Sequence, residues 1–199
     1  MLEKTLYKRG AGFTLIETLI ATALLLLLLT GAVSLASHSL SFASTYKHDL
    51  TATLLAQEGL EMLHYKRDTN ILSGIPWYTG IITAPGNQAP CGRSSRACYA
   101  QLNKADGSIT FVECSHPPNI DFTNGTSGCS PLQLDTTGST AGLFSDSGIV
   151  TTQFVRTIRV ESIGSPVPEA MRVTVMVTWP NRLGGLKKII LRETITNWP

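Results

Sequence analysis

Residues 9–36, "RGAGFTLIETLIATALLLLLLTGAVSLA", decide the fold of this chain and raise a question about membrane chemistry. No Asp, Glu, Lys or Arg lies between Glu17 and Lys47. As a helix, residues 13–36 would be about 36 Å long, enough to cross a hydrocarbon core of roughly 30 Å. Glu17 nevertheless lies near the start, where an ionised carboxylate costs about 2.5–3.5 kcal/mol on insertion scales. The sequence therefore predicts a membrane-spanning helix that carries a functional acid.

The residues ahead of the apolar segment predict its orientation. Residues 1–12 contain more basic than acidic side chains: Lys4, Lys8 and Arg9 against Glu3. Basic residues beside a membrane span hold that end of the chain in the cytoplasm. We therefore expect a single pass through the cytoplasmic membrane, in contact with its lipids, with residues after about 37 outside.

Two kinds of export signal fit this segment. An ordinary secretory signal would be cut after "SLA" at residues 34–36, but it leaves Glu17 unexplained. A cut between Gly12 and Phe13 would retain the apolar helix and create a cationic amino group on Phe13. The Glu17 carboxylate would then lie about one turn away, facing that ammonium group or the free N–H groups of the helix start, in its own chain or a neighbour. Between chains, this pairing would fix the axial register of packed helices.

At "GFTLIE" the chain resembles the type IV prepilin family, which includes pilins and the pseudopilins of type II secretion. The resemblance implies that Gly12 precedes the cleavage site, that Phe13 is the N-methylated first mature residue and that Glu17 is the assembly glutamate. It also implies cleavage by a prepilin peptidase and assembly with other pilin or pseudopilin subunits through the retained helix. One departure is that many major pilins have a proline in this helix, whereas the first proline here is Pro76.

The helical pattern continues to about residue 68, and we expect one helix over residues 13–68, with the span over about 13–36. Residues 37–68 contain no proline, and their apolar residues recur at helical spacing. The expected stripe, which would pack on the protein's own sheet, comprises Ala36, Leu40, Ala43, Tyr46, Leu50, Leu54, Leu55, Gly59, Leu60, Met62 and Leu63.

The stretch "LLAQEGLEMLHYKRD", residues 54–68, resembles the corresponding part of minor pilins and some pseudopilins. Its charged residues have two interpretations, contacts between subunits or an ordinary solvated helix face, and surface charges usually contribute little free energy. The residues concerned are Glu58, Glu61, Lys66 and Arg67.

Residues 69–199 predict an exported, β-rich domain. Residues 98–114 indicate a hairpin with its turn around 105–107, and residues 115–148 indicate a long surface excursion. Three alternating segments, 152–162, 170–179 and 186–196, predict an antiparallel meander that covers the helix. Its apolar face would contain Phe154, Ile158, Val160, Val173, Val175, Val177 and Trp179, and its polar face Thr157, Arg159 and Glu161. The expected fold is α+β and pilin-like, a long N-terminal helix on a C-terminal antiparallel sheet.

Four cysteines lie in this exported part, and an even number favours disulfides there. We prefer the pairs Cys91–Cys98 and Cys114–Cys129, because each closes a short loop. The hairpin allows the alternative of Cys98 with Cys114 and Cys91 with Cys129. A zinc site that includes His116 is not favoured, because the spacings differ from those of zinc fingers.

The sequence contains no catalytic constellation and no motif for a metal or cofactor, so we do not expect an enzyme. The formal net charge of +2 is too small to indicate nucleic acid as a partner. Basic residues do gather in the last strands, where the polar face of a sheet accounts for them as well as DNA binding does: Arg156, Arg159, Arg172, Arg182, Lys187, Lys188 and Arg192.

These observations favour a structural filament subunit, most simply a minor type IV pilin. Residues 1–12 would be its leader peptide, and the mature chain would move from the cytoplasmic membrane into the filament. A minor pseudopilin of a type II secretion system is the nearest alternative, because it needs the same helix. A secreted or membrane-anchored binding domain, with DNA as one candidate ligand, is the alternative from another class.

The two export signals predict different mature proteins. We expect the purified, exported chain to begin at Phe13, because Glu17 has a use only if the apolar helix is retained. Sequencing of the mature N-terminus checks this directly. A chain that begins at Ser37 would contradict it.

Overall fold

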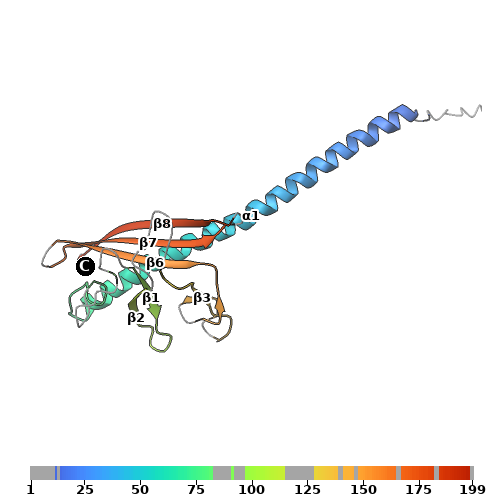
Figure 1. Cartoon of the computed structure of the whole chain (residues 1–199). Coiled ribbons are helices and arrows are strands. Elements are labelled where there is room, and N and C mark those ends of the chain that lie inside the picture. The colour runs from blue at the N-terminus through green and yellow to red at the C-terminus, as the bar shows by residue number, and fades with distance from the viewer. Residues whose placement is uncertain are drawn as a thin grey trace, which may run out of the picture. The chain divides into compact units, whose positions relative to one another are not determined.

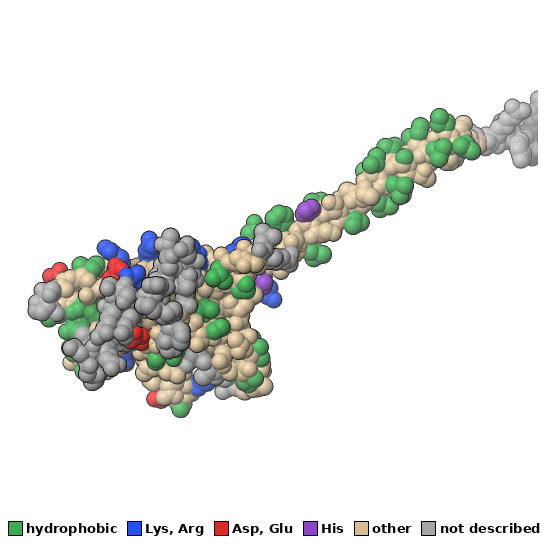
Figure 2. Space-filling view, in the orientation of Figure 1, with side chains coloured by type: hydrophobic (Ala, Val, Ile, Leu, Met, Phe, Trp, Pro, Cys, Tyr) green, Lys and Arg blue, Asp and Glu red, His purple; other side chains and the backbone are tan. Residues whose placement is uncertain are grey.

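The computed structural model describes residues 12, 14–82, 91, 97–114, 128–138, 141–145, 148–164, 167–181 and 184–197. The chain divides into two compact units, residues 1–47 and residues 48–199, and one helix, α1 (Leu15–Leu72), runs through both. In the first unit the helix is apolar and its large side chains are exposed, as at Leu15, 78%, and Leu28, 75%. Figure 2 shows hydrophobic side chains along the surface of this segment.

Helix α1 ends at Leu72, four residues beyond the end predicted from the sequence. The chain terminates it with a Schellman motif: the N–H of Ile75 donates to the carbonyl of Asn70, and the N–H of Gly74 donates to the carbonyl of Ile71. Gly74 has φ of 69°, the left-handed conformation that glycine adopts without strain. The buried Asn70 side chain then donates to the carbonyls of Trp77 and Thr79, which holds the following loop against the helix end.

The second unit contains a five-stranded antiparallel sheet in the order β2-β1-β6-β7-β8. The last three strands are the predicted meander, and their short connections place sequential strands side by side. Figure 1 shows these strands beside the second part of α1. Their bounds are β1 (Cys98–Leu102), β2 (Ile109–Glu113), β6 (Val155–Ile163), β7 (Ala170–Pro180) and β8 (Leu186–Thr196). The expected α+β architecture is confirmed.

Strands β1 and β2 form the predicted hairpin, with Leu102 opposite Ile109. The N–H of Asn103 donates to the carbonyl of Ser108, and Gly107 turns the chain with φ of 72°. Hydrogen bonds from the Ser108 hydroxyl and backbone N–H lower the pKa of the Asp106 carboxyl. The acid thus stays ionised as an acceptor in this turn.

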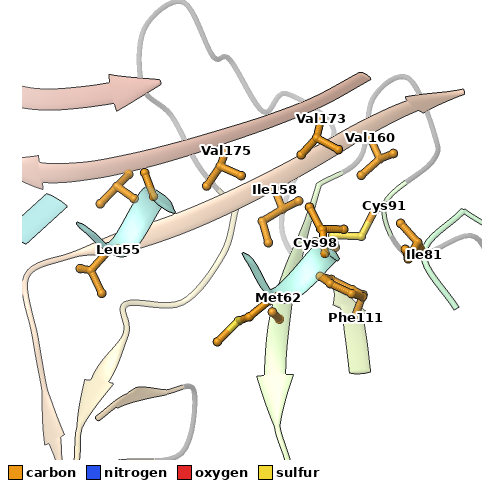
Figure 3. Packing of buried hydrophobic residues seen from close by; sticks show 14 of the residues in the cluster. Leu55, Met62, Ile81, Cys91, Cys98, Phe111, Ile158, Val160, Val173 and Val175 are labelled. Carbon is orange, nitrogen blue, oxygen red and sulfur yellow. A yellow bond between two sulfur atoms is a disulfide. The ribbon is translucent and has the colours of Figure 1, made fainter. Parts of the chain in front are cut away.

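The core lies between the sheet and the second part of α1. We call the face of the sheet that packs on the helix the inner face. Figure 3 shows Ile158 and Val175 of this face close to Leu55 and Met62 of the helix. The expected apolar residues of the meander, from Phe154 to Trp179, are all buried. Burial of such side chains contributes about 1.5–3 kcal/mol each relative to exposure.

The expected helix stripe is only partly correct. Its later members, including Leu55, Gly59 and Leu63, face the core, together with Ala52 and Ala56. Its earlier members are exposed: Leu40, 75%; Tyr46, 69%; Leu50, 62%; Leu54, 56%. Because successive residues turn by about 100°, the face that includes Ala52, Ala56 and Gly59 is on the other side of the helix from Leu50 and Leu54.

Gly59 lies at a close contact between helix and sheet. A Cβ atom at this position would lie 3.0 Å from Cγ1 of Val175 and 3.2 Å from Cδ of Arg156. Both neighbouring side chains are buried, at 0% and 1% exposure. The missing side chain therefore lets the backbone of α1 sit against two strands.

Arg156 is buried on the inner face, which corrects its assignment to the basic polar face. Arg156 lies two residues before Ile158 in β6, so the two side chains are on the same face of the sheet and both point toward the helix. One guanidinium nitrogen donates to Oε2 of Glu58 at 2.8 Å and to the carbonyl of Leu55 at 3.3 Å. The second nitrogen contacts Sδ of Met62 at 3.6 Å. A buried charge needs such a partner, so Glu58 has a role within the chain.

Two further polar pairs join the helix to β8. Nζ of Lys187 lies 3.3 Å from Oδ1 of Asp49, and Nε2 of His64 lies 3.1 Å from Oε1 of Glu193. Lys187 therefore does not belong to the proposed basic face either, because the odd-numbered residues of β8 point toward the helix. These partly exposed pairs fix the position of the strand along the helix more than they add stability.

The opposite face of the five-stranded sheet, the outer face, is only partly solvated. Thr157 was expected in water but is fully buried, as is its cross-strand neighbour Met176. Val155, on the same face, packs in a small second cluster with Tyr99 and the cysteines 114 and 129. The predicted polar face is thus covered at one end, where other parts of the chain pack on it.

Within the expected excursion 115–148, the described residues contain secondary structure that the sequence analysis missed. Strands β3 (Gln133–Leu134) and β4 (Phe144–Ser145) lie in this range, and β5 (Val150–Thr151) follows it. The three strands form a second antiparallel sheet in the order β4-β3-β5. Strands of two residues give too short an alternation to recognise from sequence.

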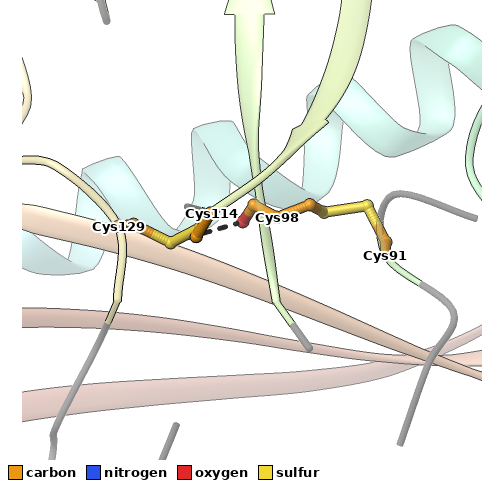
Figure 4. The surroundings of a disulfide bond; sticks show 4 residues. All are labelled: Cys91, Cys98, Cys114 and Cys129. Carbon is orange, nitrogen blue, oxygen red and sulfur yellow. Dashed lines mark hydrogen bonds between the residues drawn. A yellow bond between two sulfur atoms is a disulfide. The ribbon is translucent and has the colours of Figure 1, made fainter. Parts of the chain in front are cut away.

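Disulfides join Cys91 to Cys98 and Cys114 to Cys129, the pairing that the sequence analysis preferred. No free cysteine remains for a metal among the described residues. Figure 4 shows the two bonds side by side at the start of β1, where Sγ of Cys129 lies 3.9 Å from the carbonyl oxygen of Cys98. The 15-residue separation of the second pair corresponds to about 3 kcal/mol on the chain-entropy model.

The contact at Gly59 predicts a stability effect. We expect Gly59→Leu to lower the free energy of unfolding of residues 48–199 by about 1–3 kcal/mol, because added methylenes overpack the buried site. Thermal unfolding of the full chain in detergent micelles, followed by near-ultraviolet circular dichroism, measures this. Gly31→Leu is the matched control, since a Cβ there meets nothing within 4 Å. Equal unfolding temperatures for the two variants would contradict the argument.

Candidate functional site

The candidate site is the start of α1. Thr14 precedes the helix, and its hydroxyl oxygen accepts a hydrogen bond from the N–H of Glu17 at 3.3 Å. Its backbone carbonyl accepts from the N–H groups of Glu17 and Thr18. Thr14 is therefore the N-cap of the helix. The spacing Thr-x-x-Glu is a capping-box signal that the sequence analysis overlooked.

Glu17 lies in the first turn of the helix and is exposed. A carboxylate there interacts favourably with the helix macrodipole, by about 0.3–1 kcal/mol at an exposed site. Within the described part of the chain, no basic side chain pairs with it. Gly12 is also exposed, while Phe13 lies outside the described residues. The structure thus places Gly12 and Glu17 at the helix start, on either side of the expected cleavage site.

The helix that follows is long and apolar enough to cross a membrane, by its length and composition. Its threonine hydroxyls are satisfied within the helix. Thr18 donates to the carbonyl of Leu15 at 2.8 Å, Thr22 to that of Thr18 at 2.9 Å and Thr30 to that of Leu26 at 3.0 Å. Polar side chains in lipid need such internal partners. Among these groups Glu17 is distinct, because its charge has no partner within the described helix.

The described residues contain no metal cluster that competes with the helix start as the candidate site. Within the described ranges, no group of three or more His, Cys, Asp or Glu side chains is placed to hold a metal ion. A depression beside the hairpin is lined by residues between Gln101 and Thr110, and its Lys104 forms an ion pair with Asp135 at 2.6 Å. The ion pair of Glu58 with the buried Arg156 holds the helix to the sheet.

Residues 7–33 match the family model of the prokaryotic N-terminal methylation motif. The match marks a type IV prepilin-like protein. No curated protein and no solved structure gives a significant match to the chain. The matched residues include Gly12, Phe13 and Glu17 and continue through most of the apolar segment, so the family model and the helix-start geometry concern the same part of the chain.

The prepilin motif supports a type IV pilin or pseudopilin-like precursor that is anchored in a membrane and ends in a filament. It implies processing by a prepilin peptidase and assembly with other pilin subunits. It points to a structural subunit and not to an enzyme. The long helix on an antiparallel sheet is the pilin-like layout that the resemblance implied.

The N-cap predicts a local effect at the helix start of the prepilin. We expect Thr14→Ala to destabilise the first turn by about 1 kcal/mol, because the N–H of Glu17 loses its side-chain acceptor. The amide of Glu17 should then exchange hydrogen roughly fivefold faster, measured by nuclear magnetic resonance in micelles. Thr22→Ala is the control, because that hydroxyl donates within the helix and caps nothing. Unchanged exchange in Thr14→Ala would exclude the capping role.

Proposed function

We propose that the chain is a minor type IV pilin. It is made as a prepilin, cut after Gly12 by a prepilin peptidase and N-methylated on Phe13. Residues 13 to about 36 then hold it in the cytoplasmic membrane, with its N-terminus in the cytoplasm and its β-rich domain outside. From there it enters a filament through its N-terminal helix.

The observation that carries this proposal is the single carboxylate in the first turn of an exposed apolar helix. Glu17 is exposed, and the segment after it is uncharged as far as Lys47. A charge in lipid is costly unless it has a partner. Cleavage after Gly12 supplies a cationic chain end one turn away, which the uncleaved chain lacks.

The mechanism of the subunit is therefore assembly. The carboxylate of Glu17 pairs with the methylated amino group of Phe13 in the neighbouring subunit, and this pairing sets the axial register as helices pack side by side. Exposed leucines of both helices supply the van der Waals contacts, since lipid offers no hydrophobic driving force between them. The charge pair selects one register among many that the leucines alone would allow.

The assignment to the minor pilins rests on the resemblance of residues 54–68. The structure adds a qualification, because Glu58 in that stretch bonds to Arg156 of the same chain. Glu61 remains exposed and available to another subunit. A minor pseudopilin would use the same helix and the same glutamate, and the genes that flank this one would separate the two assignments.

The role of Glu17 has a direct test. In a host that processes and assembles the wild-type chain, Glu17→Ala should be cleaved normally but incorporated into filaments roughly tenfold less, which corresponds to about 1.4 kcal/mol of lost pairing. Immunoblots of membrane and sheared-filament fractions measure both steps. Thr22→Ala, another polar-to-alanine change in the span, is the matched control. Normal incorporation of Glu17→Ala would refute the pairing mechanism.

A further inference from the structure

The open end of the outer face carries a depression of ≈ 390 Å³ that is lined by arginines. Arg159 of β6, Thr174 of β7 and Arg192 of β8 lie in one row across the three strands. Glu161 and Arg172 form the adjacent row. The strand register therefore brings three guanidinium groups together around a threonine hydroxyl and one carboxylate.

The charges of this depression are unbalanced. Glu161 is shared by two arginines, with 3.6 Å to Nε of Arg159 and 3.6 Å to a terminal nitrogen of Arg172. Both distances exceed the roughly 2.7–2.9 Å of a charge-assisted hydrogen bond. Among the described residues, no carboxylate pairs with Arg192. Arg192 is therefore the cation of this depression whose charge no carboxylate of the described residues matches.

The fold does not depend on these arginines. The contacts that hold helix and sheet together lie on the inner face, at Arg156, Lys187 and Glu193. Arg172 and Glu161 are 58% and 47% exposed, and ion pairs at such sites contribute little stability. Figure 2 shows basic and acidic side chains next to one another over the sheet. The depression is thus accessible at Arg172, Glu161 and Arg192.

We propose that this depression binds carboxylates of an acidic segment of a partner protein. Guanidinium groups match carboxylates through two parallel hydrogen bonds, and the Thr174 hydroxyl adds a donor between Arg159 and Arg192. Glu161 occupies part of the site in the free protein, and a partner carboxylate takes over the exposed guanidinium group of Arg172 and binds that of Arg192. This role goes beyond filament assembly and does not depend on it.

The lining favours an acidic peptide over nucleic acid. A nucleic acid backbone is bound along a continuous basic track, often with aromatic rings that stack on bases. Here the described lining residues are three arginines, a threonine and a glutamate, with no aromatic ring among them. One or two carboxylates fit that charge pattern, whereas a series of phosphates would meet Glu161.

The experiment measures binding of fluorescent hexaglutamate to the full-length protein in detergent micelles. Arg192→Glu should weaken binding at least tenfold, because it removes the unpaired cation and adds an anion. Glu161→Gln should tighten binding several-fold, because it removes the internal competitor. Lys188→Glu is the matched control: the same charge change on the same face of the same strand, outside the depression, should alter binding less than twofold.

Several outcomes would overturn the proposal. They are no binding by the wild type, equal losses in Arg192→Glu and Lys188→Glu, or weaker binding in Glu161→Gln. Tighter binding of a DNA duplex than of hexaglutamate at equal salt, lost in Arg192→Glu, would assign the surface to nucleic acid instead. If Arg192→Glu does not fold, Arg192→Gln replaces it as the test variant, because it is a milder change at an exposed position. The binding assay needs no filament. A negative result in it would therefore not bear on the assembly role of Glu17, and a negative Glu17 test would not bear on binding.

Discussion

One uninterrupted helix has to suit two environments, and the rest of the chain is arranged around that constraint. The first part of α1 is exposed and apolar on all sides, and its threonines satisfy their own hydroxyls. The second part has one face that fits a sheet. A backbone in lipid must satisfy its polar groups internally, and an α-helix does so. The buried face of the second part of the same helix then packs against the β-strands.

The helix packs closely on the sheet where Gly59 and the buried Arg156 lie together. Gly59 lets the backbone approach Val175, and the space beside it holds the stem of Arg156. One terminal nitrogen of the guanidinium group donates to Glu58 and to the carbonyl of Leu55, so the charge has partners on the helix. Apolar packing would tolerate small shifts along the helix. A hydrogen-bonded charge pair allows far fewer, so the pair fixes the position of helix on sheet.

Strand parity separates the charges of the C-terminal meander into two groups with different roles. Arg156, Lys187 and Glu193 point toward the helix and find partners there. Arg159, Arg172 and Arg192 point away from it and gather around Glu161. A one-residue shift of register would exchange the two groups, which would bury the exposed arginines against the helix. The register thus determines both the core and the charged outer surface.

The sequence by itself determined the apolar helix that is long enough to span a membrane, the motif around Gly12 and Glu17, the hairpin and the meander, because length, hydropathy and alternation are local properties. It also favoured the disulfide pairing through loop length. Only the tertiary structure decided which face of α1 is buried, because Leu50 and Leu54 share one face, Leu55 lies on another, and the sheet covers only the face of Leu55. It likewise decided that Arg156 is internal and Arg192 external, since both are arginines in alternating strands. Their difference arises from where the strand lies relative to the helix, and that is a property of long-range packing.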